Sequence, residues 1–226
     1  MRIIAVIPSG GTGKRAKSEL PKQYLQFKGK ELIAYTLDVF QKCELIDEIV
    51  VSAQKDFFNL LNDIKEKYSF TKLSNIVEGG EERQDSVFNA LNSLNASDDD
   101  LIVVHDAARP LLPQDVLIQA VKTAKEFGCA VVAIRAKDTL IKGNDIIFSF
   151  VDRSEFYYVQ TPQIFTYNLL LEAFRKAGED KFQGTDESML VHRMGLKIKL
   201  VEGSSFNFKI TNQDDIKLFQ LISEHN

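Results

Sequence analysis

Residues 3–15 read Ile3-Ile4-Ala5-Val6-Ile7-Pro8-Ser9-Gly10-Gly11-Thr12-Gly13-Lys14-Arg15, an apolar run that leads into a glycine-rich turn. Short β-branched runs of this kind are typical of a strand that is buried on both faces. The glycines let backbone N–H groups approach an anion, and Lys14, Arg15, Lys17 and Lys22 supply positive charge nearby. We therefore predict a phosphate-binding loop after the first strand.

Further strands and helices alternate along the chain. The β-branched runs lie at 3–7, 49–53, 101–105, 130–134 and 198–201. Apolar residues spaced as on one helix face occur between them, at Ile33, Leu37 and Phe40, at Val87, Leu91 and Leu94, and at Leu117, Val121 and Ala124. This alternation predicts an α/β fold with a mostly parallel central sheet and helices on both faces. Ligands of such folds bind beyond the carboxyl ends of the strands.

The composition is that of a globular chain with one large core. The sequence has 226 residues, 44% hydrophobic and 27% charged, and we expect a single domain over residues 1–226. The net charge of −4 argues against a nucleic-acid or anionic-membrane partner, because such partners usually meet a basic surface. The apolar run at 3–7 is too short for a signal peptide or a membrane span, so we expect a cytoplasmic protein. Cys43 and Cys129 form no CxxC pair and are expected to be buried, reduced thiols.

The stretch 137–158 interrupts the alternation of strands and helices. Polar residues at 142–145 precede the aromatic Phe148, Phe150 and Phe156. We predict a protruding β-hairpin arm, whose apolar surface a partner subunit would cover in a homodimer. The alternative is a hairpin that packs on its own domain.

Two familiar phosphate motifs do not describe the glycine-rich loop. A Walker A loop needs a glycine and a Ser or Thr at the positions of Pro8 and Arg15. Residues 11–16 match the dinucleotide fingerprint, but Pro21 interrupts the helix that should follow, and no acid ends the second strand at 52–54. An NAD-dependent oxidoreductase is therefore disfavoured.

Eight blocks of distinctive residues follow one another along the chain. They are Gly10-Gly11-Thr12-Gly13-Lys14-Arg15 with Pro21-Lys22-Gln23, Gly79-Gly80-Glu81-Glu82-Arg83-Gln84-Asp85-Ser86-Val87, His105-Asp106-Ala107-Ala108-Arg109-Pro110, Asp138-Thr139, Val151-Asp152-Arg153, Gln160-Thr161-Pro162-Gln163, Thr185-Asp186-Glu187, and Val201-Glu202-Gly203 with Lys209-Ile210-Thr211. In this order the sequence resembles, nearly end to end, the 2-C-methyl-D-erythritol 4-phosphate cytidylyltransferases of non-mevalonate isoprenoid synthesis. The resemblance implies a three-layer α/β/α Rossmann-like nucleotidyltransferase fold with a dimerisation arm at 137–158.

The resemblance leaves one alternative for the acceptor. The ribitol 5-phosphate cytidylyltransferases share most of these blocks but tend to have Val where this chain has Ala108. Ala108 and the block at 185–187 favour the methylerythritol substrate. The chain departs from the family at Ala16, where Met is usual, and at Ser9, where Ala is usual. Both departures leave the cations in place, so they bear on nucleotide affinity rather than on activity.

The reaction that the resemblance implies needs cations rather than a general base. A phosphate monoester has a second pKa of about 6, so it is mostly dianionic at neutral pH. The obstacle is repulsion between two polyanions, and positive charge on the transition state removes it. A non-enzymatic nucleotide sensor, the second rival, would need neither Lys22 nor Asp106.

The resemblance also implies a role for each site residue. The catalytic residues would be Arg15, Lys22, Arg153 and Lys209, with Arg15 and Lys22 at the α-phosphate of CTP. The nucleotide-binding residues would be Pro8, Ser9, Gly10, Gly11, Gly13, Gly80, Glu81, Arg83, Ser86 and Ala107. The acceptor-binding residues would be Asp106, Arg109, Thr161 and Lys209, with Thr139 and Arg153 from the arm of the other subunit. Asp106 would also hold Mg²⁺ or another divalent cation, since a hard cation prefers carboxylate oxygen.

Residues in two of these blocks also have structural explanations. We interpret His105 as a packing residue beside the strand end. Thr185, Asp186 and Glu187 have the pattern of a helix N-terminus, with a capping residue and acids in the first turn.

Overall fold

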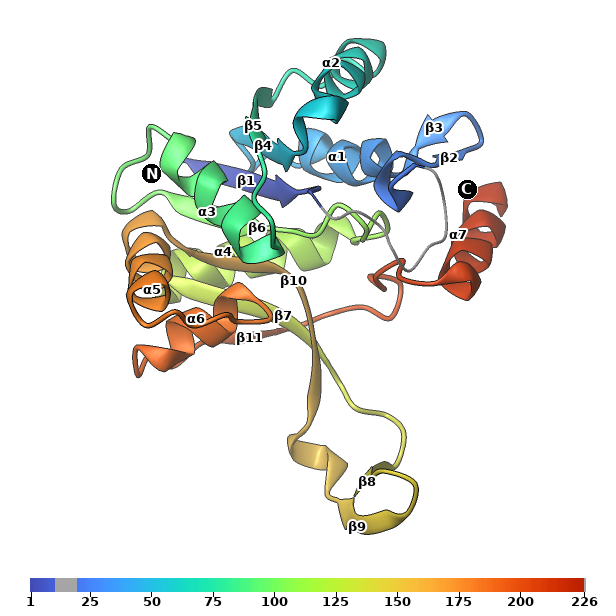
Figure 1. Ribbon diagram of the computed structural model, residues 1–226, viewed down its shortest axis with the longest axis vertical. Helices are drawn as coiled ribbons and strands as arrows, with labels where there is room; N and C mark the ends of the chain where they lie inside the picture. Colours follow the sequence, from blue (N-terminus) through green and yellow to red (C-terminus); the bar gives the residue numbers. More distant parts are fainter. Residues whose placement is uncertain (11–19, 226) are drawn as a thin grey trace.

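The protein is described here from a computed structural model, which describes residues 1–10 and 20–225. Within these residues the central sheet has seven strands, in the order β11-β7-β10-β6-β1-β4-β5 (Figure 1). The strands are β1 (Ile3–Pro8), β4 (Glu48–Ala53), β5 (Leu73–Glu78), β6 (Leu101–Val104), β7 (Cys129–Arg135), β10 (Tyr157–Thr166) and β11 (Leu200–Glu202). The five strands expected from β-branched runs are all present.

The sheet is parallel except for one strand. β1 lies inside the sheet between β4 and β6, with Val6 opposite Val50 of β4 and Val104 of β6, both in parallel register. β10 runs antiparallel between β6 and β7. The sequence did not predict β10, because its residues 157–166 include a proline and no continuous apolar run. It also missed β5, an edge strand in which only the first residue, Leu73, is buried.

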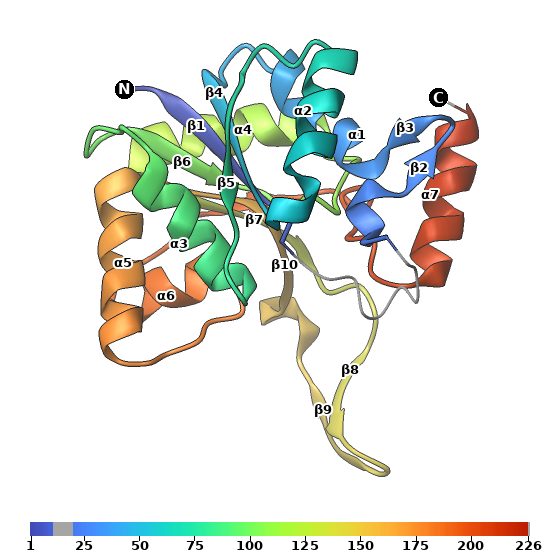
Figure 2. The same cartoon turned by 45° about the horizontal axis from the view of Figure 1, so that its top comes forward.

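Helices cover both faces of the sheet, as expected (Figure 2). Ile3, Ala5 and Ile7 of β1 face one core, which contains apolar side chains of α1 (Leu32–Lys42), α2 (Phe58–Lys67) and α4 (Gln114–Phe127). Ile4 and Val6 face the other, with α3 (Arg83–Ser93), α5 (Tyr167–Glu179) and α6 (Glu187–Arg193). This is the predicted three-layer α/β/α arrangement. No helix within residues 1–10 or 20–225 is both long and apolar enough to cross a membrane.

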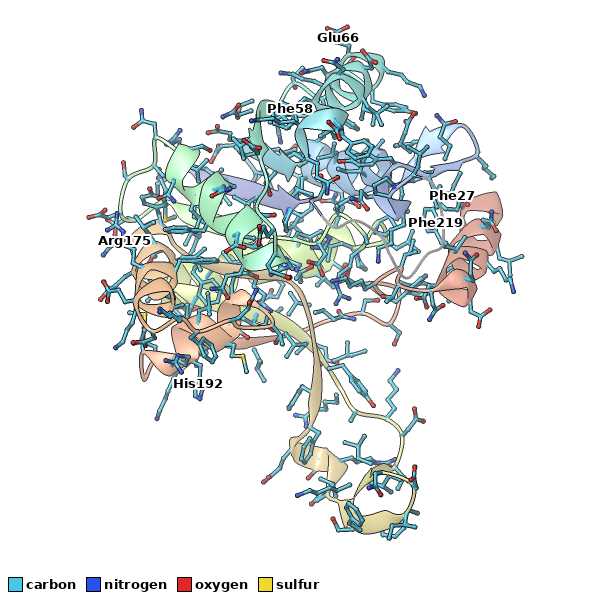
Figure 3. All side chains as sticks on the ribbon, viewed as in Figure 1. Phe27, Phe58, Glu66, Arg175, His192 and Phe219 are labelled. Atoms are coloured by element: carbon cyan, nitrogen blue, oxygen red, sulfur yellow. The ribbon has the colours of Figure 1, made fainter. Side chains whose placement is uncertain are left out.

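A third, smaller core joins the last helix to the segment after the glycine-rich loop. The hairpin of β2 (Gln26–Phe27) and β3 (Lys30–Glu31) packs against α7 (Gln213–His225). Phe27 and Phe219 meet edge to face with ring centres 5.0 Å apart (Figure 3). Ile210, which precedes α7, is buried in the same cluster. The loop's far end and residues 209–211 are therefore held together.

The stretch 137–158 forms the predicted hairpin, and it leaves the body of the molecule (Figure 1). It contains β8 (Leu140–Gly143), β9 (Ile147–Val151) and a short 3-10 helix at Arg153–Glu155. We keep the name arm for 137–156, because Tyr157 and Tyr158 belong to β10 and pair with β7. Phe148 and Phe150 are exposed rather than packed on their own domain.

Candidate active site

The two ends of the glycine-rich loop are fastened to the sheet. Ser9 follows β1, and its backbone N–H donates to the Ser52 carbonyl at 2.7 Å. Gln23 Nε2 donates to the Ser9 carbonyl at 2.6 Å, and the Tyr24 hydroxyl lies 3.1 Å from Ser9 Oγ. Burial raises the pKa of Tyr24 to about 12, so this hydroxyl stays protonated. The predicted site residues Gly11, Gly13 and Arg15, and Ala16, lie outside the described residues.

A second loop meets the first at Ser86. The Gly80 N–H donates to Ser86 Oγ at 3.0 Å, and that hydroxyl donates to the Glu82 carbonyl at 3.0 Å. A Cβ on Gly10 would lie 3.0 Å from the same Oγ, and a Cβ on Gly80 would overlap Asp85 at 2.2 Å. Neither position accepts a side chain without movement. The fold thus brings together Gly10, Gly80 and Ser86, three residues predicted to bind the nucleotide.

Three further predicted nucleotide residues, Pro8, Ala107 and Glu81, lie in different environments. Pro8 ends β1 and is buried. Ala107 is buried, and its carbonyl accepts a bond from Thr36 Oγ1 at 2.9 Å. Glu81 is exposed on the second loop.

Asp106, just beyond β6, is surrounded by three cations. Arg83 Nε donates to its Oδ1 at 2.8 Å, while Lys209 Nζ and Arg109 Nε lie 2.9 and 3.5 Å from its Oδ2. Burial alone would raise the pKa of the Asp106 carboxyl, but the charges of Arg83, Lys209 and Arg109 hold it well below the usual value. Asp106 is therefore an anion over the whole physiological range of pH.

Glu187 completes this cluster from α6. Its two oxygens accept from Arg83 Nη1 and Nη2 at 2.6 and 3.0 Å, and it is 1% exposed. Burial would lower the pKa of Arg83, but Glu187 and Asp106 raise it above its usual value. We call Arg83, Asp106, Arg109, Glu187 and Lys209 the polar centre.

The N-terminal pattern at 185–187 is confirmed, with Glu187 as an acid in the first turn of α6, but it does not account for the burial of Glu187. Asp186 caps α6, accepting from the Met189 N–H at 3.0 Å. Glu187 was explained by the helix dipole, which needs only an exposed acid in the first turn. The structure instead buries its carboxylate against Arg83, a residue 104 positions away in the sequence. A local pattern cannot reveal such a partner.

His105 has the structural role expected of it. It is fully buried, its Nδ1 lies 3.1 Å from Thr161 Oγ1, and its Nε2 lies 3.0 Å from the Arg109 carbonyl. Because the Arg109 carbonyl can only accept, Nε2 carries the proton, and Nδ1 accepts from the Thr161 hydroxyl, which itself accepts from the Asp106 N–H. Burial lowers the pKa of His105 to about 4. A neutral imidazole therefore fixes the turn that carries Asp106 and Arg109.

A pocket of ≈ 130 Å³ opens beside the polar centre. This volume is small beside the roughly 300–1,000 Å³ of a typical ligand pocket, so it suits a small acceptor better than a nucleotide. Its lining residues come from α3, from the turn after β6, from a register shift in β10 and from the loops before α6 and α7; they are Arg83, Asp106, Arg109, Val159, Gln160, Thr161, Gln163, Thr185, Asp186 and Lys209.

Four of the predicted acceptor residues meet in this pocket, and two do not. Asp106, Arg109, Thr161 and Lys209 line it. Thr139 and Arg153 are exposed on the arm, where Arg153 Nη1 donates to the Lys137 carbonyl. Gln160, Gln163 and Thr185 also line the pocket; they belong to the distinctive blocks, but no binding role was predicted for them.

Lys22 connects the glycine-rich loop to this pocket. Its Nζ donates to the Ile210 carbonyl at 2.6 Å, so its ammonium group lies next to the residue that follows Lys209. The contact joins positions 188 apart in the sequence. Two predicted catalytic lysines are thereby brought to the same side of the site.

Known proteins resemble this chain over its whole length. A family model described as IspD: 2-C-methyl-D-erythritol 4-phosphate cytidylyltransferase matches residues 3–225. A Clostridium perfringens 2-C-methyl-D-erythritol 4-phosphate cytidylyltransferase is 39% identical over 227 residues, covering 99% of this chain and 98% of that protein. The crystal structure of the Francisella tularensis enzyme of that name superposes with a TM-score of 0.83 at 30% identity, covering 98% of this chain and 99% of the other. The 4-diphosphocytidyl-2C-methyl-D-erythritol synthase structure from Anaerococcus prevotii gives 0.86 at 28% identity, covering 99% and 96%.

Proposed function

The chain belongs to the 2-C-methyl-D-erythritol 4-phosphate cytidylyltransferase family, and from that membership we propose the reaction that it catalyses. The protein transfers CMP from CTP to 2-C-methyl-D-erythritol 4-phosphate, giving 4-CDP-2-C-methyl-D-erythritol and pyrophosphate in non-mevalonate isoprenoid synthesis. The observation that carries the proposal is the small cationic pocket beside the fastened glycine-rich loop.

The chemistry needs no proton acceptor from the protein. An oxygen of the dianionic acceptor phosphate attacks the α-phosphorus of CTP, a new P–O bond forms, and the bond to the β,γ-pyrophosphate breaks. Pyrophosphate leaves with the electron pair of that bond. The site agrees with this route, because both ring nitrogens of His105 are engaged and the carboxylate of Asp106 is ion-paired.

Cations on the two sides of the attacked phosphorus supply the catalysis. Lys22, together with Arg15, stabilises the charge that develops at the α-phosphate. Lys209 and Arg109 hold the acceptor phosphate in the pocket that they line.

Asp106 is the residue that fits Mg²⁺. Within the described residues no three His, Cys, Asp or Glu side chains gather as metal ligands. A single carboxylate is nonetheless enough, because Mg²⁺ usually takes one or two carboxylates and completes its shell with substrate phosphates and water. Bound there, the ion would neutralise triphosphate charge. Lys209, whose side chain is 38% exposed, has room to give up Oδ2 for the acceptor phosphate.

The arm supports a homodimer with shared sites. Its aromatic side chains are exposed in the single chain, and a second subunit would cover them. Arg153 and Thr139 of one arm would then reach the pocket of the partner. A cytoplasmic location also stays a prediction.

An assay of pyrophosphate release tests the reaction and its alternative. CTP, UTP, ATP and GTP are each combined with 2-C-methyl-D-erythritol 4-phosphate and with D-ribitol 5-phosphate, with and without Mg²⁺. We expect release only with CTP, Mg²⁺ and the methylerythritol acceptor. Equal turnover of ribitol 5-phosphate, or a preference for ATP, would contradict the assignment.

A further inference from the structure

Glu187 is a buried acid whose whole hydrogen-bonding capacity serves one arginine. At 1% exposure, it accepts bonds from Arg83 at both carboxylate oxygens. A buried ion pair is costly to desolvate and contributes little net stability compared with apolar packing. Its presence beside a pocket therefore calls for an explanation other than stability.

The pair fixes the direction of the third Arg83 donor. A guanidinium group is planar and rigid, so holding Nη1 and Nη2 also sets where Nε points. Nε points to Asp106 Oδ1, at 2.8 Å. Oδ1 is thereby occupied, and Oδ2 is left toward Lys209 and Arg109.

The pair also joins the two halves of the site. Arg83 begins α3, three residues after Gly80 and three before Ser86. Glu187 begins α6, directly after Thr185 and Asp186, which line the pocket. A shift of either helix would turn the Asp106 carboxylate.

Charge in the polar centre gives Glu187 a second effect. Three cations face two acids, which leaves one net positive charge. Glu187 compensates the charge of Arg83. The charges of Lys209 and Arg109 are then available to Asp106 and to a bound phosphate. Without Glu187, Arg83 would be drawn toward bound phosphates instead.

We propose that Glu187 is a positioning residue for phosphate transfer, which holds Arg83 so that Asp106 Oδ1 is fixed and Oδ2 faces the reacting groups. The inference rests on the proposed function. Glu187 is buried and does not line the pocket, so it acts on turnover through Arg83 and Asp106.

The test compares Glu187→Gln with wild type under saturating and limiting substrates. The amide keeps the size and one acceptor but loses the charge-assisted bidentate pair. We expect kcat to fall by about tenfold while the KM for CTP changes less than about twofold, because small misplacements of catalytic groups reduce turnover more than binding. Asp180→Asn is the matched control. Asp180 pairs at 2.9 Å with Arg193, which lies on α6 like Glu187, but Asp180 is exposed and outside the polar centre. Its kcat should equal that of wild type.

A double-mutant cycle separates positioning from a general loss of structure. If Glu187 acts through Arg83, the double variant Arg83→Gln/Glu187→Gln will have the kcat of Arg83→Gln alone. Losses that multiply, or a folded Glu187→Gln protein with wild-type kcat, would overturn the proposal. Should Glu187→Gln not fold, Glu187→Asp, which keeps the charge, replaces it with the same two criteria. Wild-type protein that fails to use methylerythritol phosphate would contradict the proposed function instead, and the cycle would then be run with the acceptor that the pyrophosphate assay selects.

Discussion

The polar centre and the arm are opposite departures from an ordinary protein surface. In the polar centre, charged side chains are buried, with Asp106 and Glu187 at 7% and 1% exposure. In the arm, Phe148 and Phe150 are 59% and 71% exposed. Globular proteins usually bury the second kind of residue and expose the first. We therefore propose that another molecule completes each of these two places.

The chemistry of each region indicates which kind of molecule it suits. The polar centre carries an excess of positive charge beside a small pocket, which suits a phosphate. The arm exposes the aromatic side chains of Phe148 and Phe150, which suits an apolar protein surface. Changes in the first region should act on turnover or folding within one chain, and changes in the second should act between chains.

The largest effect is expected at Lys22, on the loop that adjoins the polar centre. Lys22→Ala should lower kcat on the order of 10²-fold or more, because removing one preorganised electrostatic partner of a transition state commonly has that effect. Steady-state pyrophosphate release measures it. The assignment of Lys22 to the α-phosphate depends on this loss.

Lys17→Ala is the control for Lys22, since both lysines belong to the same loop sequence. We expect Lys17→Ala to keep nearly all activity. An equal loss in both variants would mean that the loop needs positive charge in general, and it would contradict the assignment of Lys22 to the α-phosphate.

His105 should make the free energy of unfolding of the protein depend on pH. Its folded pKa is about 4, below the usual 6.5, so the unfolded chain binds a proton first as the pH falls. Stability from this group is therefore fully present above about pH 6.5 and is lost as the pH falls toward 4, by at most ~3 kcal/mol. Asp106, with its lowered pKa, acts only at lower pH. Unfolding by urea at several pH values measures the slope.

Two histidine variants test the cause of this dependence of the unfolding free energy on pH, one at the buried ring and one as its control. His105→Gln removes the titrating ring and should flatten the slope between pH 4 and 6.5, although it also lowers stability at pH 7. His192→Gln, on the outer side of α6 (Figure 3), should keep the wild-type slope. An unchanged slope in His105→Gln would mean that other groups cause the acid sensitivity.

The sequence predicted the parallel part of the sheet better than the antiparallel part. Strands such as 3–7 and 49–53 are buried on both faces, so their composition alone reveals them. The strand predicted at 198–201 lies at the sheet edge as Leu200–Glu202, where only Val201 is buried, so composition marks its bounds less sharply. β10 has no comparable signal, and without it the arm could not be given its end at 156.

The site residues likewise divide into those that the strand pattern predicted and those that it did not. Asp106 and the glycine-rich loop follow strand ends, so an α/β pattern places them in the site. Lys209, Arg109 and Arg153 were assigned through the resemblance, since the first two reach the pocket from loops and Arg153 lies on the arm. Glu187 was explained locally because its partner Arg83 is distant in the sequence. Contacts of that kind depend on how helices pack, which no periodicity records.

The last prediction concerns both regions at once, through sites shared between subunits. Lys22→Ala and Arg153→Ala homodimers should each be nearly inactive. When the two variants are refolded together in equal amounts, about half of the dimers should be mixed, and each mixed dimer keeps one site with both residues. Activity should then recover to roughly a quarter of wild type, if distant sites act independently. Lys22→Ala refolded with wild-type-like Asp180→Asn calibrates the mixing, and native mass spectrometry counts the mixed dimers. Because Arg153 lies on an arm that contributes nothing to the described pocket of its own chain, recovery requires that it act across the interface. If mixed dimers form without recovery, Arg153 acts in its own subunit's site or in neither site, and the arm serves assembly alone.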